Sequence, residues 1–199
     1  MKLRPARAPA LLAALLMFPV ALFAQKTSVE SLCRLHGIEQ QESIAQIREA
    51  YVAALNAGIS EDELSPFVED ILKHKLDCAQ MVRVLFVTTT LRRDGLPYFV
   101  VFSKVREGVT KEAPPALVVE AAESKLKTLT LSRDVLKSLE SSGYRVLDFQ
   151  NAAVIVSSYL EKGFQPGEVV SEIRNKGIEG AGFAALAGVL EKPVKRKER

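Results

Sequence analysis

Apolar residues recur at intervals of three and four over most of this chain, and that spacing predicts α-helices. One such run ends before Gly58, where a helix would stop, and consists of Ile44, Ile47, Tyr51, Ala54 and Leu55. No Asn-Gly turn separates two alternating apolar runs, so a sheet built from hairpins is not expected. The sequence therefore predicts an all-α fold, either a helical bundle or a short, solenoid-like stack of helical hairpins.

Two β-prone segments, Phe99–Phe102 and Leu85–Val87, lie inside longer helical patterns. We predict a helix at both, because the spacing of three and four continues through them. In the second helix the core face is expected to carry Val82, Leu85 and Phe86.

Capping residues indicate where several helices begin. Ser60 and Glu63 form a capping-box pair, and Asp148 is suited to cap a later helix. Ser132 is expected to cap a short helix of its own, after the preceding helix ends near Leu129. Further on, the small residues from Gly180 to Gly188 are expected to let helices pack closely.

A weak internal repeat is consistent with stacked hairpins. It aligns three glycine–apolar pairs, each followed ten residues after its glycine by a β-branched residue: Gly58-Ile59 with Val68, Gly95-Leu96 with Val105, and Gly163-Phe164 with Ile173. Its spacing suits helical-hairpin arrays, in which each pair buries its face against a neighbour. Chance recurrence in any helical chain explains it equally well, so bundle and stack both stay open.

The first 24 residues have the organisation of a secretory signal peptide. Three basic residues, Lys2, Arg4 and Arg7, precede an apolar run that ends at the small residue Ala24. This run is shorter than the roughly 20 apolar residues of a membrane-spanning helix. We expect cleavage after Ala24, a single helical domain over residues 25–191, and a periplasmic or secreted protein.

The net charge of the chain after the predicted signal peptide excludes few classes of function. Three of the 27 basic residues lie in the predicted signal peptide, so 24 remain against 24 acidic residues. The last eight residues, 192–199, contain five basic residues and one acidic residue, and we expect a disordered basic tail. Such a tail could attach to an anionic surface. Aromatic residues do not alternate with its basic residues, and a nucleic-acid partner is not expected.

Cys33 and Cys78 are the two cysteines of the chain. An even number of cysteines in an exported protein favours a disulfide, which would remove about 4 kcal/mol of unfolded-state entropy. His36 and His74 lie three and four residues from them, so the four side chains could instead hold zinc tetrahedrally. Because the compartment favours oxidation, we predict a Cys33–Cys78 disulfide, no metal and no cofactor.

No set of catalytic residues is evident in the sequence. His36 and His74 are the only histidines, and Gly-x-Ser-x-Gly and His-Glu-x-x-His motifs are missing. Glu30-Ser31 matches the glutamate-serine pair of lytic transglycosylases without the residues that should follow it. An enzyme that uses carboxylates on cell-wall material stays an alternative that no particular motif favours.

One segment resembles a stretch of uncharacterised exported helical proteins of bacteria. Those proteins share a Lys-x-x-Glu-Gly-x-x-Lys core and a following proline, as in Lys104 to Lys111 followed by Pro114. Glu112 stands where the resemblance implies a glycine, so the junction is expected to differ. Glu107 and Lys111 are expected to stabilise their helix as an acid–base pair four residues apart. The resemblance implies an envelope protein and supplies no catalytic residue.

Together these observations predict a non-enzymatic binding or scaffold protein of the cell envelope, whose partner is a protein or another envelope component. Two alternatives stay open. One is a metal-binding or redox module at Cys33, His36, His74 and Cys78, and the other is a cell-wall-acting enzyme.

Overall fold

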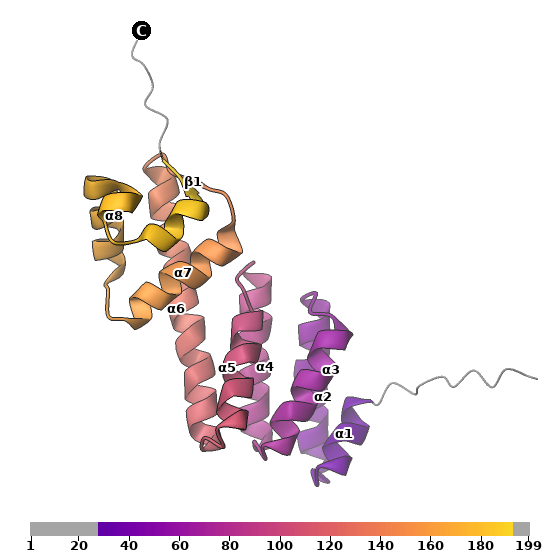
Figure 1. Cartoon of the computed structure of the whole chain (residues 1–199). Helices are drawn as coiled ribbons and strands as arrows, with labels where there is room; N and C mark the ends of the chain where they lie inside the picture. The colour runs from indigo at the N-terminus through magenta and orange to yellow at the C-terminus, as the bar shows by residue number, and fades with distance from the viewer. Residues whose placement is uncertain (1–27, 193–199) are drawn as a thin grey trace, which may run out of the picture.

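The structure is a computed structural model that describes residues 28–192. Its helices are α1 (Val29–Leu35), α2 (Gln41–Asn56), α3 (Glu61–Lys73), α4 (Cys78–Arg93), α5 (Phe99–Thr110), α6 (Pro115–Ser141), α7 (Phe149–Glu161), α8 (Pro166–Gly180) and the 3₁₀ helix η1 (Ala184–Gly188). Two short strands, β1 (Arg145–Val146) and β2 (Leu190–Glu191), pair antiparallel. The all-α prediction is confirmed, including helices at both β-prone segments (Figure 1).

The predicted signal peptide, residues 1–24, and residues 193–199 of the basic tail lie outside the described residues. Within residues 28–192, none of the helices combines the length and the apolar character that crossing a membrane requires.

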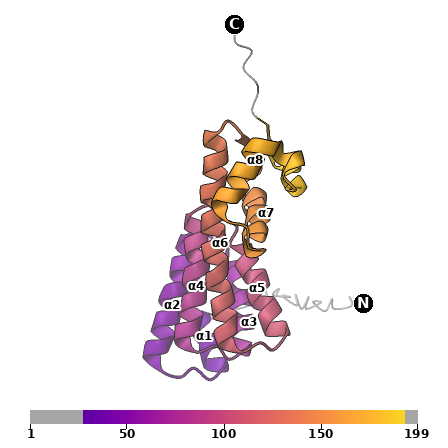
Figure 2. The ribbon, with the colours of Figure 1, turned by 90° about the vertical axis from the view of Figure 1, so that its left-hand side faces the viewer.

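The helices form two halves that share α6. In the N-terminal half, α2, α4 and the start of α6 lie side by side in one layer (Figure 2). Helices α3 and α5 form the second layer, with α1 packed against α2 and α3 (Figure 1). In the C-terminal half, α7 and α8 pack on the far end of α6, and η1 packs on both of them. Each half therefore builds its core against a different stretch of the same helix.

The helices α1 to α7 all end with the same backbone motif. After each C-cap comes a residue with positive φ, and the next N–H donates to the carbonyl five positions back. The positive-φ residues are Gly37, Gly58, Lys75, Gly95, Glu112, Gly143 and Gly163. Three of these endings are the glycine–apolar pairs of the weak repeat. Val68, Val105 and Ile173 are buried in the helices that follow.

The repeat therefore reflects a shared helix ending that closes successive helical hairpins. Hairpin α2–α3 stacks on hairpin α4–α5, since α2 packs on α4 and α3 on α5. Aromatic packing joins the second layer, where the rings of Phe67 and Phe102 stack with centroids 4.0 Å apart. This stack places α2 and α4 next to each other on the outside of the molecule.

The prediction that α6 divides near Ser132 is wrong. Helix α6 continues from Pro115 to Ser141, and Ser132 is fully buried within it. The Ser132 hydroxyl donates to the Thr128 carbonyl at 2.7 Å instead of capping a new helix. Leu129 and Leu136, on either side of Ser132, are also fully buried, so packing favours an unbroken helix over the local capping preference.

Two smaller expectations also need correction. Ser60 is the N-cap of α3, but its hydroxyl donates to the Glu63 carboxylate at 2.7 Å rather than accepting from the backbone. Helix α8 ends at Gly180, and the residues from there to Gly188 form a turn and η1 rather than a close helix–helix contact. At Gly182 and Gly188 an added Cβ would meet no atom within 4 Å.

Candidate functional site

The four residues considered for a metal site do not come together. His74 Nε2 lies 2.7 Å from the Ala113 carbonyl, which ties the end of α3 to the turn before α6. His36 is the C-cap residue of α1 and lies near Glu69, whose pKa is lowered mainly by its hydrogen bond to Lys73 and slightly by His36. Among residues 28–192, no group of three or more His, Cys, Asp or Glu could hold a metal. The arrangement therefore gives no support to the zinc alternative.

The two cysteines carry free thiols, so the predicted disulfide is not formed in the structure. Cys33 is buried in α1, and Cys78 opens α4. The Cys78 thiol points at α2, where it donates to the Ser43 carbonyl at 3.5 Å and to Gln46 Oε1 at 3.4 Å. Burial raises the pKa of the Cys33 thiol, and the nearby Cys78 raises it further.

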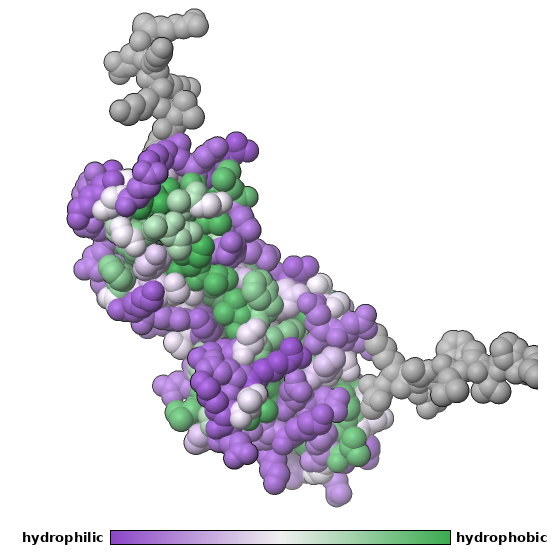
Figure 3. Space-filling model, viewed as in Figure 1, coloured by the Kyte–Doolittle hydropathy of each residue, from purple (hydrophilic) through white to green (hydrophobic). Residues whose placement is uncertain are grey.

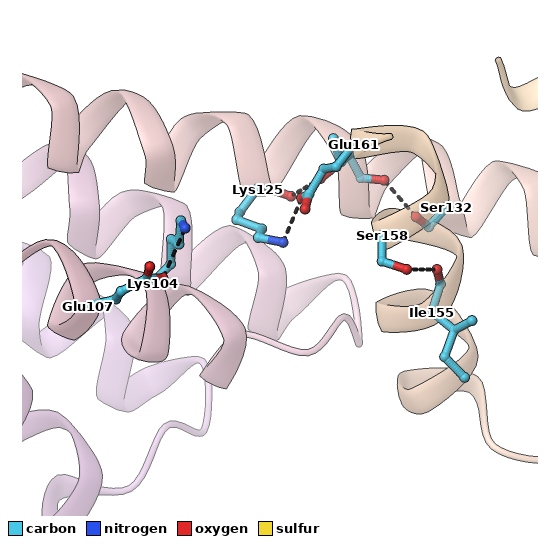
Figure 4. Close-up of polar contacts among 8 residues, drawn as sticks. Lys104, Glu107, Lys125, Ser132, Ile155, Ser158 and Glu161 are labelled. Carbon is cyan, nitrogen blue, oxygen red and sulfur yellow. Dashed lines mark hydrogen bonds and ion pairs between the residues drawn. The ribbon is translucent and has the colours of Figure 1, made fainter. Parts of the chain in front are cut away.

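The Lys-x-x-Glu-Gly-x-x-Lys segment has a structural explanation. Glu107 pairs with Lys111 and, as Figure 4 shows, with Lys104, and these two ion pairs lower the pKa of its carboxyl to about 2. An added Cβ at Gly108 would lie 2.9 Å from Val118 Cγ2, so this glycine lets α5 and α6 pack closely. The predicted pairing of Glu107 with Lys111 is confirmed, and the residues of this segment serve packing and helix stability.

Glu112 does not change the junction after this segment. Its φ of 52° is the conformation that a glycine adopts at the ends of the other helices. The next N–H, of Ala113, donates to the Gly108 carbonyl at 2.9 Å, as the shared motif requires. A glutamate therefore occupies a left-handed position that favours glycine.

A polar cluster attaches α7 to α6 (Figure 4). Lys125 pairs with Glu161 at 2.6 Å, and the Lys125 side chain is only 16% exposed. The Ser158 hydroxyl donates to the Ile155 carbonyl at 2.7 Å, within α7. These groups find their partners within the protein, so we interpret the cluster as a structural joint rather than a reactive site.

The most distinctive surface feature is a groove of about 300 Å³ between α2 and α4. We call it the aromatic groove and define it by its lining residues, Gln46, Glu49, Ala50, Ala53, Val82, Phe86, Thr89 and Arg93. Its floor is mainly small and apolar, and Phe86 stands beside that floor with 63% of its surface exposed. A large aromatic side chain exposed to this extent beside a concave apolar surface is typical of a binding site.

The prediction that Phe86 lies on the core face of its helix is wrong. Leu85 is fully buried, and adjacent helix residues point about 100° apart, so Phe86 cannot face the same way. Among the buried residues of α4, Met81, Val84, Leu85 and Thr88 follow the spacing of three and four. That spacing excludes Phe86, and this is the signal in the sequence that could have identified it.

The aromatic groove carries one acidic and one basic residue that lack partners. Within the described part of the chain, neither Glu49 nor Arg93 forms an ion pair or a side-chain hydrogen bond, and both are exposed. The neighbouring Arg92 differs, because it donates to the Gly58 carbonyl and lies 5.5 Å from the Tyr98 ring. The groove therefore presents an apolar floor and two opposite charges that remain available to a partner.

The face shown in Figure 3 has a different character. There the N-terminal half is mostly hydrophilic, and apolar surface gathers over the C-terminal half, around α7 and η1. Three aromatic rings in that half pack against one another, since Tyr159, Phe164 and Phe183 meet edge to face. Phe164 is 42% exposed, less than Phe86.

No protein-family model matches the chain, and comparisons with curated proteins and with solved structures likewise find no match. The function is therefore inferred from the geometry of this molecule.

Proposed function

We propose that this chain is a non-enzymatic scaffold protein exported to the cell envelope, and that the aromatic groove binds a helical segment of protein. The observation that carries the proposal is Phe86, a large aromatic residue left exposed beside an apolar groove on an otherwise well-packed stack. Aromatic side chains contribute most of the affinity in many protein interfaces because each buries about 150–250 Å².

The shape of the groove favours a helix as the bound element. Helices α2 and α4 run side by side, and the surface between two such helices accepts the side chains of a third helix. The small residues Ala50 and Ala53 would allow close approach of that third helix.

Export is inferred from the sequence of residues 1–24. Attachment of the basic residues 192–199 to an anionic surface is a second proposed contact with the envelope.

Photo-crosslinking tests this function in the exported protein. A photo-crosslinking amino acid replaces Phe86 in one variant and Leu35, an exposed residue of α1, in a matched control. We expect position 86 to give one discrete protein adduct, competed by excess unlabelled protein with an intact groove and not by a Phe86→Ser competitor. Position 35 should give none. Equal labelling at both positions, or no protein adduct at position 86, would contradict the proposal.

We also propose that Cys33 and Cys78 become disulfide-bonded after export. The support is that Cys78 lies near enough to raise the pKa of the Cys33 thiol, together with the oxidising character of the compartment. In the reaction, two thiols lose two protons and two electrons to a disulfide-containing oxidant, which is reduced to its dithiol form. The bond would fasten α1, a helix of seven residues, to the start of α4.

Thiol counting on the denatured, unreduced protein tests the disulfide, with elemental analysis of the same sample. We expect no free thiol and no stoichiometric zinc, and reduction should destabilise the domain by about 2–4 kcal/mol. Two free thiols with one zinc per chain would instead support the metal alternative.

A further inference from the structure

We infer that one face of the C-terminal half rests on an anionic lipid bilayer, with the basic residues 192–199 bound to the headgroups beside it. This inference rests on the proposed attachment of those residues to an anionic surface, and it names that surface as lipid. It is carried by two segments without charged residues, which pack together where the basic tail begins.

Both segments lie in the C-terminal half. Residues 149–160 make up nearly all of α7 and residues 180–190 include η1, and neither segment contains a charged residue, although 26% of the chain is charged. Helix α7 packs against η1. Together they produce the apolar surface that Figure 3 shows over this half. A gathered apolar surface of this kind marks a contact with a partner or a membrane.

The exposed part of this surface follows η1. We call it the η1 face and define it by its exposed apolar residues, Leu147, Phe164, Ala184, Ala185 and Ala187. The ring of Phe164 lies 5.6 Å, between centroids, from the ring of Phe183, which precedes η1. The Leu147 N–H donates at 2.8 Å to the carbonyl of Val189, which follows η1. The η1 face therefore extends along the whole of η1, with a large apolar residue at each end.

The composition of the η1 face favours lipid over protein. Protein interfaces are enriched in aromatic residues, methionine and arginine and depleted in alanine, whereas three of the five residues here are alanine. A lipid bilayer accepts any apolar surface, because binding there scales with the apolar area buried and with the attraction to anionic lipids. An acidic polymer would supply the attraction but no apolar phase.

The charges beside the η1 face supply that attraction. Strand β2 contacts η1, so Lys192 follows directly beside the face. The acidic residues that flank residues 180–190 are already paired, Glu179 with Lys192 at 3.4 Å and Glu191 with Arg145 at 3.7 Å. Residues 193–199 then contain four basic residues and one acidic residue.

The tail is long enough to reach the same lipid surface as the η1 face. A segment of seven residues spans at most about 24 Å, and η1 is about 10 Å long. Each basic residue close to an anionic membrane strengthens binding about five-fold. Two weak contributions, apolar contact and headgroup attraction, thus act on one surface, and such a pair of signals is what holds a protein stably at a membrane.

A single tryptophan tests the apolar contact, because the chain contains none. Leu147→Trp places the reporter on the η1 face, and Leu35→Trp places it on α1 as a matched control, since both leucines are exposed. The exported protein is mixed with vesicles of phosphatidylcholine and phosphatidylglycerol in equal amounts. Fluorescence at position 147 should shift to shorter wavelength and be quenched by brominated acyl chains, because the ring enters the boundary of the hydrocarbon. Fluorescence at position 35 should not change.

Flotation of the tryptophan-free protein with the same vesicles measures what each part contributes. The triple variant Lys195→Glu, Arg196→Glu and Lys197→Glu should bind at least thirty-fold more weakly. Leu147→Ser, which removes a half-exposed side chain, should bind about five-fold more weakly, and Leu35→Ser should bind as wild type does. Salt at about 0.5 M should weaken wild-type binding.

The outcomes separate this inference from the proposed function. Binding to anionic vesicles without quenching at position 147 would leave the attachment of the tail standing and overturn the η1 face as a lipid contact. No binding to anionic vesicles would overturn both. A photo-crosslinker at position 147 that labels an envelope protein and not lipid would also overturn the inference. The crosslink at position 86 is a separate measurement, so the function of the aromatic groove stands or falls independently.

Discussion

The N-terminal and C-terminal halves of the molecule build their cores in different ways. Both halves end helices with a left-handed residue followed by an apolar residue, but only the N-terminal half stacks the resulting hairpins in two layers. The C-terminal half has a kink at Gly177, a 3₁₀ helix and a two-residue ladder that pairs Arg145 with Glu191. It also depends on the long helix α6, whose beginning belongs to the other half.

This difference shows where local sequence rules decide the structure and where tertiary packing does. In the N-terminal half, most of the helix boundaries can be predicted from caps and glycines. In the C-terminal half, burial of Leu129 and Leu136 keeps α6 continuous across a residue that favours a cap. The aromatic groove lies on the outer surface of the N-terminal half, between α2 and α4.

The largest predicted effect is at the centre of α6. Ser132→Pro removes a backbone donor and clashes with the preceding turn, so it should cost about 3 kcal/mol or more. Ser132→Ala keeps the helix and loses only one buried hydroxyl, and it should cost about 1 kcal/mol. Urea unfolding measures both, and hydrogen exchange locates the damage. We expect Ser132→Pro to expose amides of α7 and α8 first. An equal loss of hydrogen-exchange protection in α2 would contradict the division of the molecule into two halves that share α6.

The joint between α5 and α6 gives the next effect. Gly108→Ala places a Cβ 2.9 Å from Val118 Cγ2 and should destabilise the protein by about 1–3 kcal/mol, although alanine is normally the better helix former. Combination with Val118→Ala should recover part of that loss, since the smaller side chain removes the clash. Thermal unfolding of the single and double variants checks this. A Gly108→Ala protein that is more stable than wild type would show that α5 and α6 are not tightly packed.

The shared helix endings predict smaller effects of opposite sign. Glu112→Gly should stabilise the protein by about 0.5–1 kcal/mol, because Glu112 has a left-handed φ of 52°. Gly95→Ala should destabilise it by about 1 kcal/mol for the same backbone reason, since an added Cβ there meets no neighbouring atom. Chemical denaturation of the two variants tests the pair. Two changes of the same sign would refute a common ending.

The smallest effect concerns the exposed carboxylate of Glu107. Because its pKa is lowered to about 2, its contribution to stability is fully present above its ordinary pKa of 4.5 and is lost as the pH falls towards 2. Glu107→Gln should therefore be slightly less stable than wild type at pH 6, with the difference shrinking below pH 4. Urea midpoints at pH 6 and pH 3 measure it. The difference should also shrink in high salt, and a salt-independent difference would contradict an ionic origin.

Much of the fold could be predicted from the sequence, because caps and spacing act within a few residues. The predicted cap at Asp148, for example, is confirmed, since its carboxylate accepts from the Asn151 backbone at 3.0 Å. The unbroken α6 and the turn at Gly182 could not be predicted, because they depend on packing between segments far apart in the sequence. The left-handed conformations of Lys75 and Glu112 likewise have no signal in their residue types.

The candidate site could be predicted less well than the fold. Cysteine and histidine spacing within short segments indicates two pairs, but in the fold the four side chains do not form one group, and only Cys78 influences Cys33. Apolar residues surround Phe86 in the sequence, and they favour a core position that the folded helix does not give it. Glu49 and Arg93 carry no signal of their own, because the lack of an ion-pair partner is a property of the folded surface.

The central claim is that Phe86 serves binding and not folding. The most direct measurement compares the free energies of urea unfolding of Phe86→Ala and Phe67→Ala with wild type, at a protein concentration below about 1 μM, where binding through the groove does not contribute to stability. We predict a change within about 0.5 kcal/mol for Phe86→Ala, whose side chain is largely exposed. Phe67 is fully buried, and Phe67→Ala should lose about 3–5 kcal/mol. A loss at Phe86 as large as the loss at Phe67 would show that Phe86 belongs to the core, and would contradict this account.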